Sequence, residues 1–213
     1  MTIVDPIAQG CEEEGRTMEE PSTRDKILKA MYQLIAEKGY DKASISQVCS
    51  LVGITKPSLY YYFPSKEELF LAVSESMWPT LDSFDESFLA THDAEAYRAY
   101  LDETGRSIIA NYHDDEERRN VLAEIDLQAT RIPGIGSQQK RLGTSMVDAL
   151  TAMLQHGVDI GVFENDFDVH GNAKFLYVVL SGISQVISRH ENPDVNDTWS
   201  KALNAVFREA AQH

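Results

Sequence analysis

The chain has 213 residues, of which 43% are apolar and 25% charged, and its formal net charge is −15. This length suits one domain or two small ones with a buried core. No apolar run reaches the roughly 18–20 residues that cross a bilayer, no secretory signal stands at the N-terminus, and the two cysteines lie in different surroundings. We therefore expect a cytoplasmic globular protein without a structural disulfide.

The negative charge is spread unevenly along the chain. Residues 1–21 carry six acids and one arginine, residues 22–70 carry seven Lys or Arg and five acids, and residues 71–213 carry eleven bases and twenty-three acids. Only residues 22–70 are net basic. Because exposed charges more than about 8–10 Å apart are largely screened, a local basic segment can attract nucleic-acid phosphates even in an acidic protein.

The first patterned segment is a helix that begins at Ser22. The acidic residues 1–21 offer little that could pack, and we expect a disordered tail there. Asp25 stands at capping-box spacing from Ser22, and Gly39 ends the helix. Its apolar residues repeat at helical spacing and predict a core face made of Ile27, Ala30, Met31, Leu34 and Ile35.

Two short helices joined by a tight turn follow, in the sequence SISQVCSLVGITKPSLYYYFPSK of residues 44–66. The first is expected over residues 46–51, after a capping box of Ser44 and Gln47. Gly53 marks the bend, and the second helix opens at Thr55 and stops before Pro64. The apolar residues expected in a small three-helix core are Val48, Leu51, Val52, Ile54 and Leu59. This pattern predicts a helix-turn-helix, a motif that binds DNA.

The rest of the chain predicts helices and no strand. A helix starting at Ser65 runs through Met77, and Pro79 kinks or interrupts it. The segment Ile132-Pro133-Gly134 is expected to end a later helix, and a loop rich in Gly and acids follows Gly157. The helices expected beyond Pro79 cover residues 94–112, 115–131, 135–157, 169–189 and 195–211. The predicted fold class is all-α.

Residues 23–68 carry four motifs in a fixed order: EKGY at the end of the first helix, then SISQV, GITKPSLYYYF and PSKEEL. In this order they resemble the N-terminal domain of the tetracycline-repressor (TetR) family of transcriptional regulators. Beyond them, GVFENDFDVHGNAKFLYVVLSG resembles a loop and helix common near the dimer interface of that family. The resemblance implies a helix-turn-helix DNA-binding domain over residues 22–68 and a helical ligand-binding and dimerisation domain over residues 69–213, with about nine helices in all.

The same resemblance implies a function. We expect a ligand-responsive repressor that binds a palindromic operator as a homodimer and is released by a small-molecule effector. No enzymatic activity, cofactor, metal or membrane partner is expected.

In a helix-turn-helix, the first residues of the second helix face the base edges in the major groove. Lys56 can donate to guanine, Ser58 can donate or accept, and Pro57 can contact a thymine methyl group. Thr55 is the expected helix cap, which commits its hydroxyl to backbone amides. By resemblance, the remaining DNA-binding residues are Tyr60 and Tyr61, Lys66 against a phosphate, and Ser44, Ser46 and Gln47 on the preceding helix. Tyr62 is left open between the DNA face and the core.

Two further sets of residues concern the C-terminal helices. An apolar stripe around Gly182, which would let a second copy approach closely, predicts a dimer interface rather than an internal core. That interface would comprise Val178, Val179, Gly182, Ile183, Val186, Trp199, Leu203, Val206 and Phe207. The resemblance also implies a ligand cavity, whose candidate lining residues are Trp78, Phe84, Phe88, Tyr97, Leu101, Tyr112, Ile125, Met146, Met153 and Phe175. Aromatic and Met residues at this spacing equally suit a plain core.

Two other functions compete with this interpretation. The adjacent pair His113 and Asp114 is used by helical HD-type metal-dependent phosphohydrolases, but no second spaced His pair supports a metal site. An acidic helical adaptor that binds proteins would suit the net charge. It would leave the basic and aromatic residues between Lys56 and Lys66 without a purpose.

Overall fold

The structure is a computed structural model that describes residues 21–77, 93–113, 115–189, 191 and 194–209. Over these residues it contains nine α-helices and no strand, which confirms the predicted all-α class. Residues 1–20 of the predicted tail, the kink at Pro79 and the cavity candidates Phe84 and Phe88 lie outside the described residues. None of the described helices is long and apolar enough to span a membrane.

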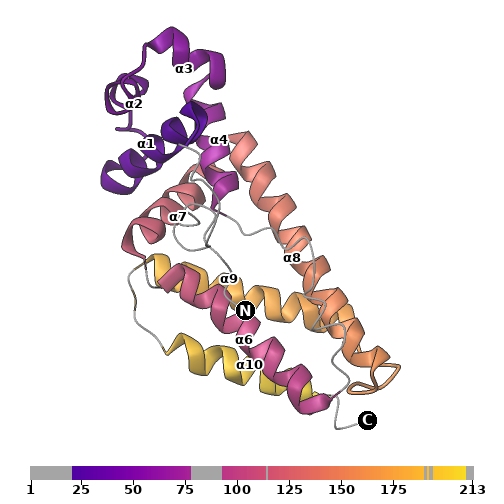
Figure 1. Cartoon of the computed structure of the whole chain (residues 1–213). Coiled ribbons are helices and arrows are strands. Elements are labelled where there is room, and N and C mark those ends of the chain that lie inside the picture. The colour runs from indigo at the N-terminus through magenta and orange to yellow at the C-terminus, as the bar shows by residue number, and fades with distance from the viewer. Residues whose placement is uncertain (1–20, 78–92, 114, 190, 192–193, 210–213) are drawn as a thin grey trace, which may run out of the picture. The chain divides into compact units, whose positions relative to one another are not determined.

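The chain divides into two compact units (Figure 1). The first comprises Met1–Pro79 and Asp115–Gln138, and the second comprises Thr80–Asp114 and Gln139–His213. The first unit holds α1 (Thr23–Lys38), α2 (Ile45–Val52), α3 (Lys56–Tyr62), α4 (Lys66–Ser76), α7 (Glu116–Ala129) and the first turns of α8 (Pro133–Asp159). The second holds α6 (Ala94–His113), the rest of α8, α9 (Val169–Ser188) and α10 (Val195–Glu209).

The core of the first unit is built on the predicted face of α1. All five of its apolar residues are buried, and they are joined by Val48, Leu59 and the apolar residues of α4. Leu51 departs from the prediction, because 60% of its surface is exposed. Consecutive helix positions are about 100° apart, so Leu51 lies on the side of α2 opposite the buried Cys49.

Helix α7 packs along α1 and holds the ends of neighbouring segments. The Asn120 side-chain amide donates to the Ala36 carbonyl at 3.4 Å, and the Arg118 guanidinium donates to the Met77 carbonyl just past the end of α4. Arg131 lies 3.7 Å from the Asp41 carboxylate. These contacts tie α7 and the residues after it to the end of α1, the loop before α2 and the end of α4.

Helix α8 begins at Pro133, whereas the sequence predicts that Ile132-Pro133-Gly134 ends the preceding helix. Proline fits the first position of a helix, because the amide it lacks would have no partner inside the helix. The same residue therefore both follows the end of α7 and opens α8.

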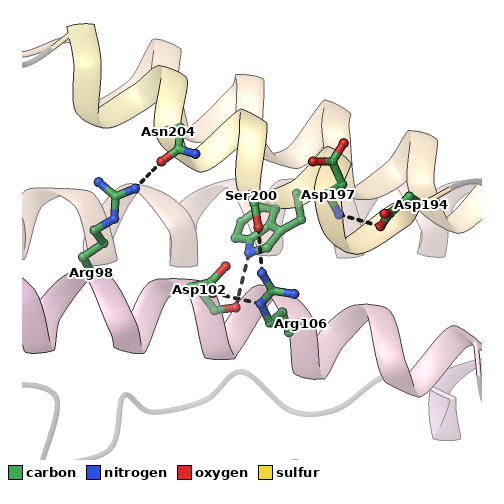
Figure 2. A network of polar contacts seen from close by, with 8 residues as sticks. Arg98, Asp102, Arg106, Asp194, Asp197, Ser200 and Asn204 are labelled. Atoms are coloured by element: carbon green, nitrogen blue, oxygen red, sulfur yellow. Dashed lines mark hydrogen bonds and ion pairs between the residues drawn. The ribbon is translucent and has the colours of Figure 1, made fainter.

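In the second unit, α6, α9 and α10 pack against one another, and they lie side by side in Figure 1. The indole of Trp199 fills a slot at Gly105, where an added Cβ would lie 2.1 Å from the ring. Polar contacts flank this slot along α6 and α10 (Figure 2). The Trp199 indole N–H donates to the Asp102 carbonyl at 3.2 Å, and the Arg106 guanidinium donates to Ser200 at 2.6 Å.

Tyr97 anchors the other helices of this unit. Its ring is fully buried, with Phe163 and Phe207 at centroid distances of 5.9 and 6.2 Å. Its hydroxyl donates to the Met153 carbonyl at 3.0 Å, and burial raises the pKa of this phenol well above its usual range.

Candidate nucleic-acid interface

The two helices of the motif are fixed at their ends by local contacts. The Ser44 hydroxyl caps α2 by accepting from the Gln47 amide at 3.3 Å, and the Gln47 side chain accepts from the Ser44 amide at 3.0 Å. Gly53 follows α2 with φ 76°, a left-handed conformation that glycine adopts without strain. Thr55 then caps α3 by accepting from the Ser58 amide. This geometry orients α3.

One face of α3 is anchored in the core and the rest of the helix is open to solvent. Leu59 is fully buried, whereas Lys56, Pro57 and Ser58 are exposed. The exposed first turn thus offers an ammonium, an apolar ring and a hydroxyl. This is the mixture of groups that distinguishes base edges in a major groove.

Three consecutive tyrosines continue this surface. Tyr61 is 84% exposed, Tyr60 46% and Tyr62 39%. The rings of Tyr61 and Tyr62 meet edge to face, with centroids 5.3 Å apart. Tyr62, which the sequence left open between core and surface, therefore belongs to the exposed row.

The predicted residues on α2 fall into two groups. Ser46 is exposed with no role in a cap. Ser44 and Gln47 form the capping box, so the Gln47 oxygen is occupied and its side-chain NH₂ remains as a donor. Likewise the Thr55 hydroxyl is shared between the Ser58 amide and hydroxyl, as expected for a cap.

Lys66 is held by contacts within the chain, whereas the other predicted DNA-binding lysine, Lys56, is exposed. The Lys66 Nζ donates to the Tyr40 carbonyl at 2.6 Å and lies 4.1 Å from the centroid of the Tyr40 ring. Burial lowers the pKa of this ammonium, while nearby Asp41 and Glu124 raise it. Because these contacts tie the start of α4 to the loop before α2, Lys66 has a positioning role that the sequence did not indicate.

A basic and aromatic recognition helix, held at a fixed angle by a left-handed glycine turn and three caps, defines a helix-turn-helix DNA-binding protein. The sequence model described as "Bacterial regulatory proteins, tetR family" matches residues 27–73. Residues 27–73 are therefore a DNA-binding domain of the TetR type.

Two curated relatives are transcriptional regulators by name. The HTH-type transcriptional regulator UidR of Escherichia coli K12 is 23% identical over 162 residues, covering 76% of this chain and 79% of UidR. The HTH-type transcriptional repressor NicS of Pseudomonas putida is 28% identical over 151 residues, covering 71% and 70%.

Two solved structures show the same fold. A TetR transcription regulator from Haloarcula marismortui has a TM-score of 0.67 at 20% identity, covering 89% of this chain and 96% of its own. A complex of SmeT with triclosan has a TM-score of 0.65 at 17% identity, covering 89% and 91%.

The residues predicted for a dimer interface fall into an exposed or partly exposed group and a buried group. On α9, Val178 is 64% exposed and Gly182 is exposed, while Val179 and Val186 are partly exposed. Phe207 on α10 is also partly exposed, but it packs against Phe163 of its own chain. The other four already lie in the core of a single chain: Ile183, Trp199, Leu203 and Val206. Burial within one chain leaves these four side chains little surface for a second copy, and the interface as a whole stays a prediction.

The residues predicted to line a ligand cavity fall in both units of the chain, and their role stays a prediction. Tyr97, Leu101 and Met153 are buried in the second unit, and Met146 is partly exposed there. Ile125 is buried in the first unit. Phe175 is 42% exposed and lies on the outer side of α9, three residues before Val178, so its ring faces solvent in the single chain. Trp78, Phe84, Phe88 and the Tyr112 side chain lie outside the described residues.

The alternative of a metal-dependent hydrolase gains no support from the structure. No group of three or more His, Cys, Asp or Glu side chains that could hold a metal occurs among the residues whose side chains are described. The His113 side chain and Asp114, on which that alternative depended, lie outside them.

Proposed function

We propose that this protein is a cytoplasmic repressor that binds a palindromic operator as a homodimer and is released by a small-molecule effector. The observation that carries the DNA-binding part is the exposed first turn of α3, with Lys56, Pro57 and Ser58 held outward from the buried Leu59. Ser46, Tyr60 and Tyr61 extend the proposed contact surface. Ser44, Gln47 and Thr55 support it through their caps, and Lys66 supports it through its contact with Tyr40.

The homodimer is supported by the outer face of α9. Phe175, Val178 and Gly182 recur at intervals of three and four residues, so they share one stripe of the helix. Phe175 and Val178 are large apolar side chains exposed in the single chain, and contiguous apolar surface of this kind favours association. An added Cβ at Gly182 would meet nothing within 4 Å, so this chain leaves room for a partner helix.

Dimerisation gives the operator its form. In a two-fold dimer, two recognition helices enter successive major grooves about 34–36 Å apart, and the half-sites are inverted repeats. An effector that favours a dimer with a different spacing releases the DNA by population shift. The TetR-type DNA-binding domain supports effector control, and SmeT, solved as a complex with triclosan, supports a small molecule as the effector. Tyr97, Leu101, Met146 and Met153 remain the proposed cavity residues of the second unit.

This proposal is tested with the purified chain and an operator selected from random DNA. We expect two protomers bound per operator by mass measurement in solution. Compounds that raise the melting temperature should then lower operator affinity. A complex with one protomer per operator would contradict the dimer, and stabilising compounds that tighten DNA binding would contradict release by effector.

A further inference from the structure

A second element meets the recognition helix at its C-terminal end. The first turn of α1 places the Arg24 guanidinium over the ring of Phe63, with Cζ 5.3 Å from the ring centroid. Phe63 is the C-cap of α3, and its side chain is only 4% exposed. Attraction between a guanidinium and an aromatic face holds this arginine in a defined place beside the exposed tyrosines.

The charge of Arg24 is left uncompensated in this arrangement. Its neighbour Asp25 turns back to the helix cap, where Oδ2 accepts from the Ser22 hydroxyl at 2.6 Å and from the Ser22 amide at 3.2 Å. Among the residues that the structure describes, Arg24 forms no ion pair, and its side chain is exposed. Its planar fork of N–H donors is therefore presented next to α3 with no hydrogen-bond acceptor among residues 21–77, 93–113, 115–189, 191 and 194–209.

The end of α3 is where DNA phosphates would lie. Helix α3 has seven residues and is about 10 Å long, while the major groove is about 8.5 Å deep. With the first turn of an inclined α3 at the base edges, its C-terminal end rises to the rim of the groove. The rim is formed by the sugar–phosphate backbone, and arginine binds phosphate through two parallel N–H donors.

We propose that Arg24 is a phosphate-binding residue of the DNA interface, contributed by α1 from outside the helix-turn-helix. Stacked on Phe63, its guanidinium meets a backbone phosphate at the rim of the groove whose floor Lys56 reads. Contacts of this kind fix the register and orientation of a recognition helix and carry no sequence information themselves. The inference rests on the proposed function, since it requires that α3 enter a major groove.

The test measures operator affinity of the full-length chain over a range of salt. Each phosphate contact contributes about 0.9 to the slope of log affinity against log salt. Arg24→Gln removes one phosphate contact from each of the two protomers, so the slope falls by about twice that amount. The ratio of native affinity to variant affinity should therefore fall about twelvefold between roughly 50 and 200 mM salt. Arg24→Lys keeps the charge and should retain most of the slope.

Lys201→Gln is the matched control, because it removes the same charge from an exposed residue of α10 that pairs with Asp197 at 2.5 Å. It should leave the slope unchanged. Melting temperatures of all variants, followed by circular dichroism, separate a loss of fold from a loss of contact.

Three results would overturn the proposal. If Arg24→Gln lowers affinity equally at every salt concentration, Arg24 only supports the fold through Phe63. If the slope falls as much for Lys201→Gln, the effect belongs to net charge and not to this position. If the native chain selects no DNA at all, the proposed function fails and this inference fails with it. If the native chain binds normally and Arg24→Gln leaves the salt slope unchanged, the inference alone fails.

Discussion

Gly105→Ala tests the packing of α6 on α10. A Cβ at this position would lie 2.1 Å from Cε2 and 2.2 Å from Cζ2 of Trp199, whereas carbon atoms in contact lie about 3.5–4.0 Å apart. The indole must therefore withdraw, yet it is 2% exposed and its N–H donates to the Asp102 carbonyl. Relief of this overlap has to come from a shift of one helix against the other.

The magnitude follows from two opposing effects. Overpacking of a well-packed core costs about 1–3 kcal/mol, while replacing glycine by alanine inside a helix gains about 1 kcal/mol. Because the overlap involves the body of a buried ring, we take the upper end of the overpacking range. The free energy of unfolding should therefore fall by about 1–2 kcal/mol. For a unit of this size each kcal/mol lowers the melting temperature by about 4–8 °C.

Thermal unfolding of Gly105→Ala, Trp199→Phe and the double variant measures this effect. The smaller phenyl ring leaves room for the new methyl group, so the double variant should lose less stability than the sum of the single variants, by about 1 kcal/mol. Lys201→Ala on the exposed side of α10 is the control, because it removes only a surface ion pair with Asp197 and should leave the melting temperature nearly unchanged. Additive losses, or a Gly105→Ala variant as stable as the native chain, would refute the close packing.

Other predictions concern the DNA surface and the dimer. Lys56→Ala should weaken binding to the selected operator by about 1–3 kcal/mol per half-site and relax the base preference there, with an unchanged melting temperature; a competition assay with unaltered specificity would dismiss this role. Tyr60→Ala should weaken binding to all sequences alike, and a change confined to one base would argue against a backbone contact. Lys66→Met should lower the melting temperature and reduce affinity in parallel at all salt concentrations, since its ammonium holds the Tyr40 carbonyl; a reduced salt slope would instead reveal a phosphate contact. Gly182→Leu should leave helicity intact and convert the dimer to a monomer, and an unchanged mass by light scattering would count against the α9 interface.

The DNA-binding end could be predicted from the sequence because its signals are local. Ser44 with Gln47 specifies the start of α2, and Gly53 adopts the left-handed conformation that its position in the pattern indicates. Thr55 specifies the start of α3. Each of these contacts joins residues within a few positions of one another, so the pattern and the structure carry the same information.

The packing of the C-terminal helices could not be predicted from the sequence in the same way. The apolar stripe of α10 indicates that Trp199 is covered, but a stripe does not tell whether the cover comes from the same chain or from a second copy. The answer depends on Gly105, ninety-four residues earlier, whose missing side chain makes the slot. The contact of Asn120 with Ala36 joins residues 84 positions apart and likewise leaves no local signal.

Phe175 and Leu51 illustrate the same limit on a smaller scale. Leu51 is predicted in the core because it is apolar, and Phe175 is a candidate lining residue of the cavity that the family resemblance implies. Each lies on the side of its helix that its own chain leaves uncovered. Periodicity identifies the faces of a helix, and tertiary packing decides which of two apolar faces is covered.

The central claim is that α3 reads DNA as part of a two-fold dimer. Selection of binding sites from a random pool of duplex DNA by the purified chain tests it most directly. We predict enrichment of an inverted repeat whose half-sites are centred about 10 base pairs, one helical turn, apart. Failure to enrich any sequence, or enrichment of a single half-site without symmetry, would contradict it.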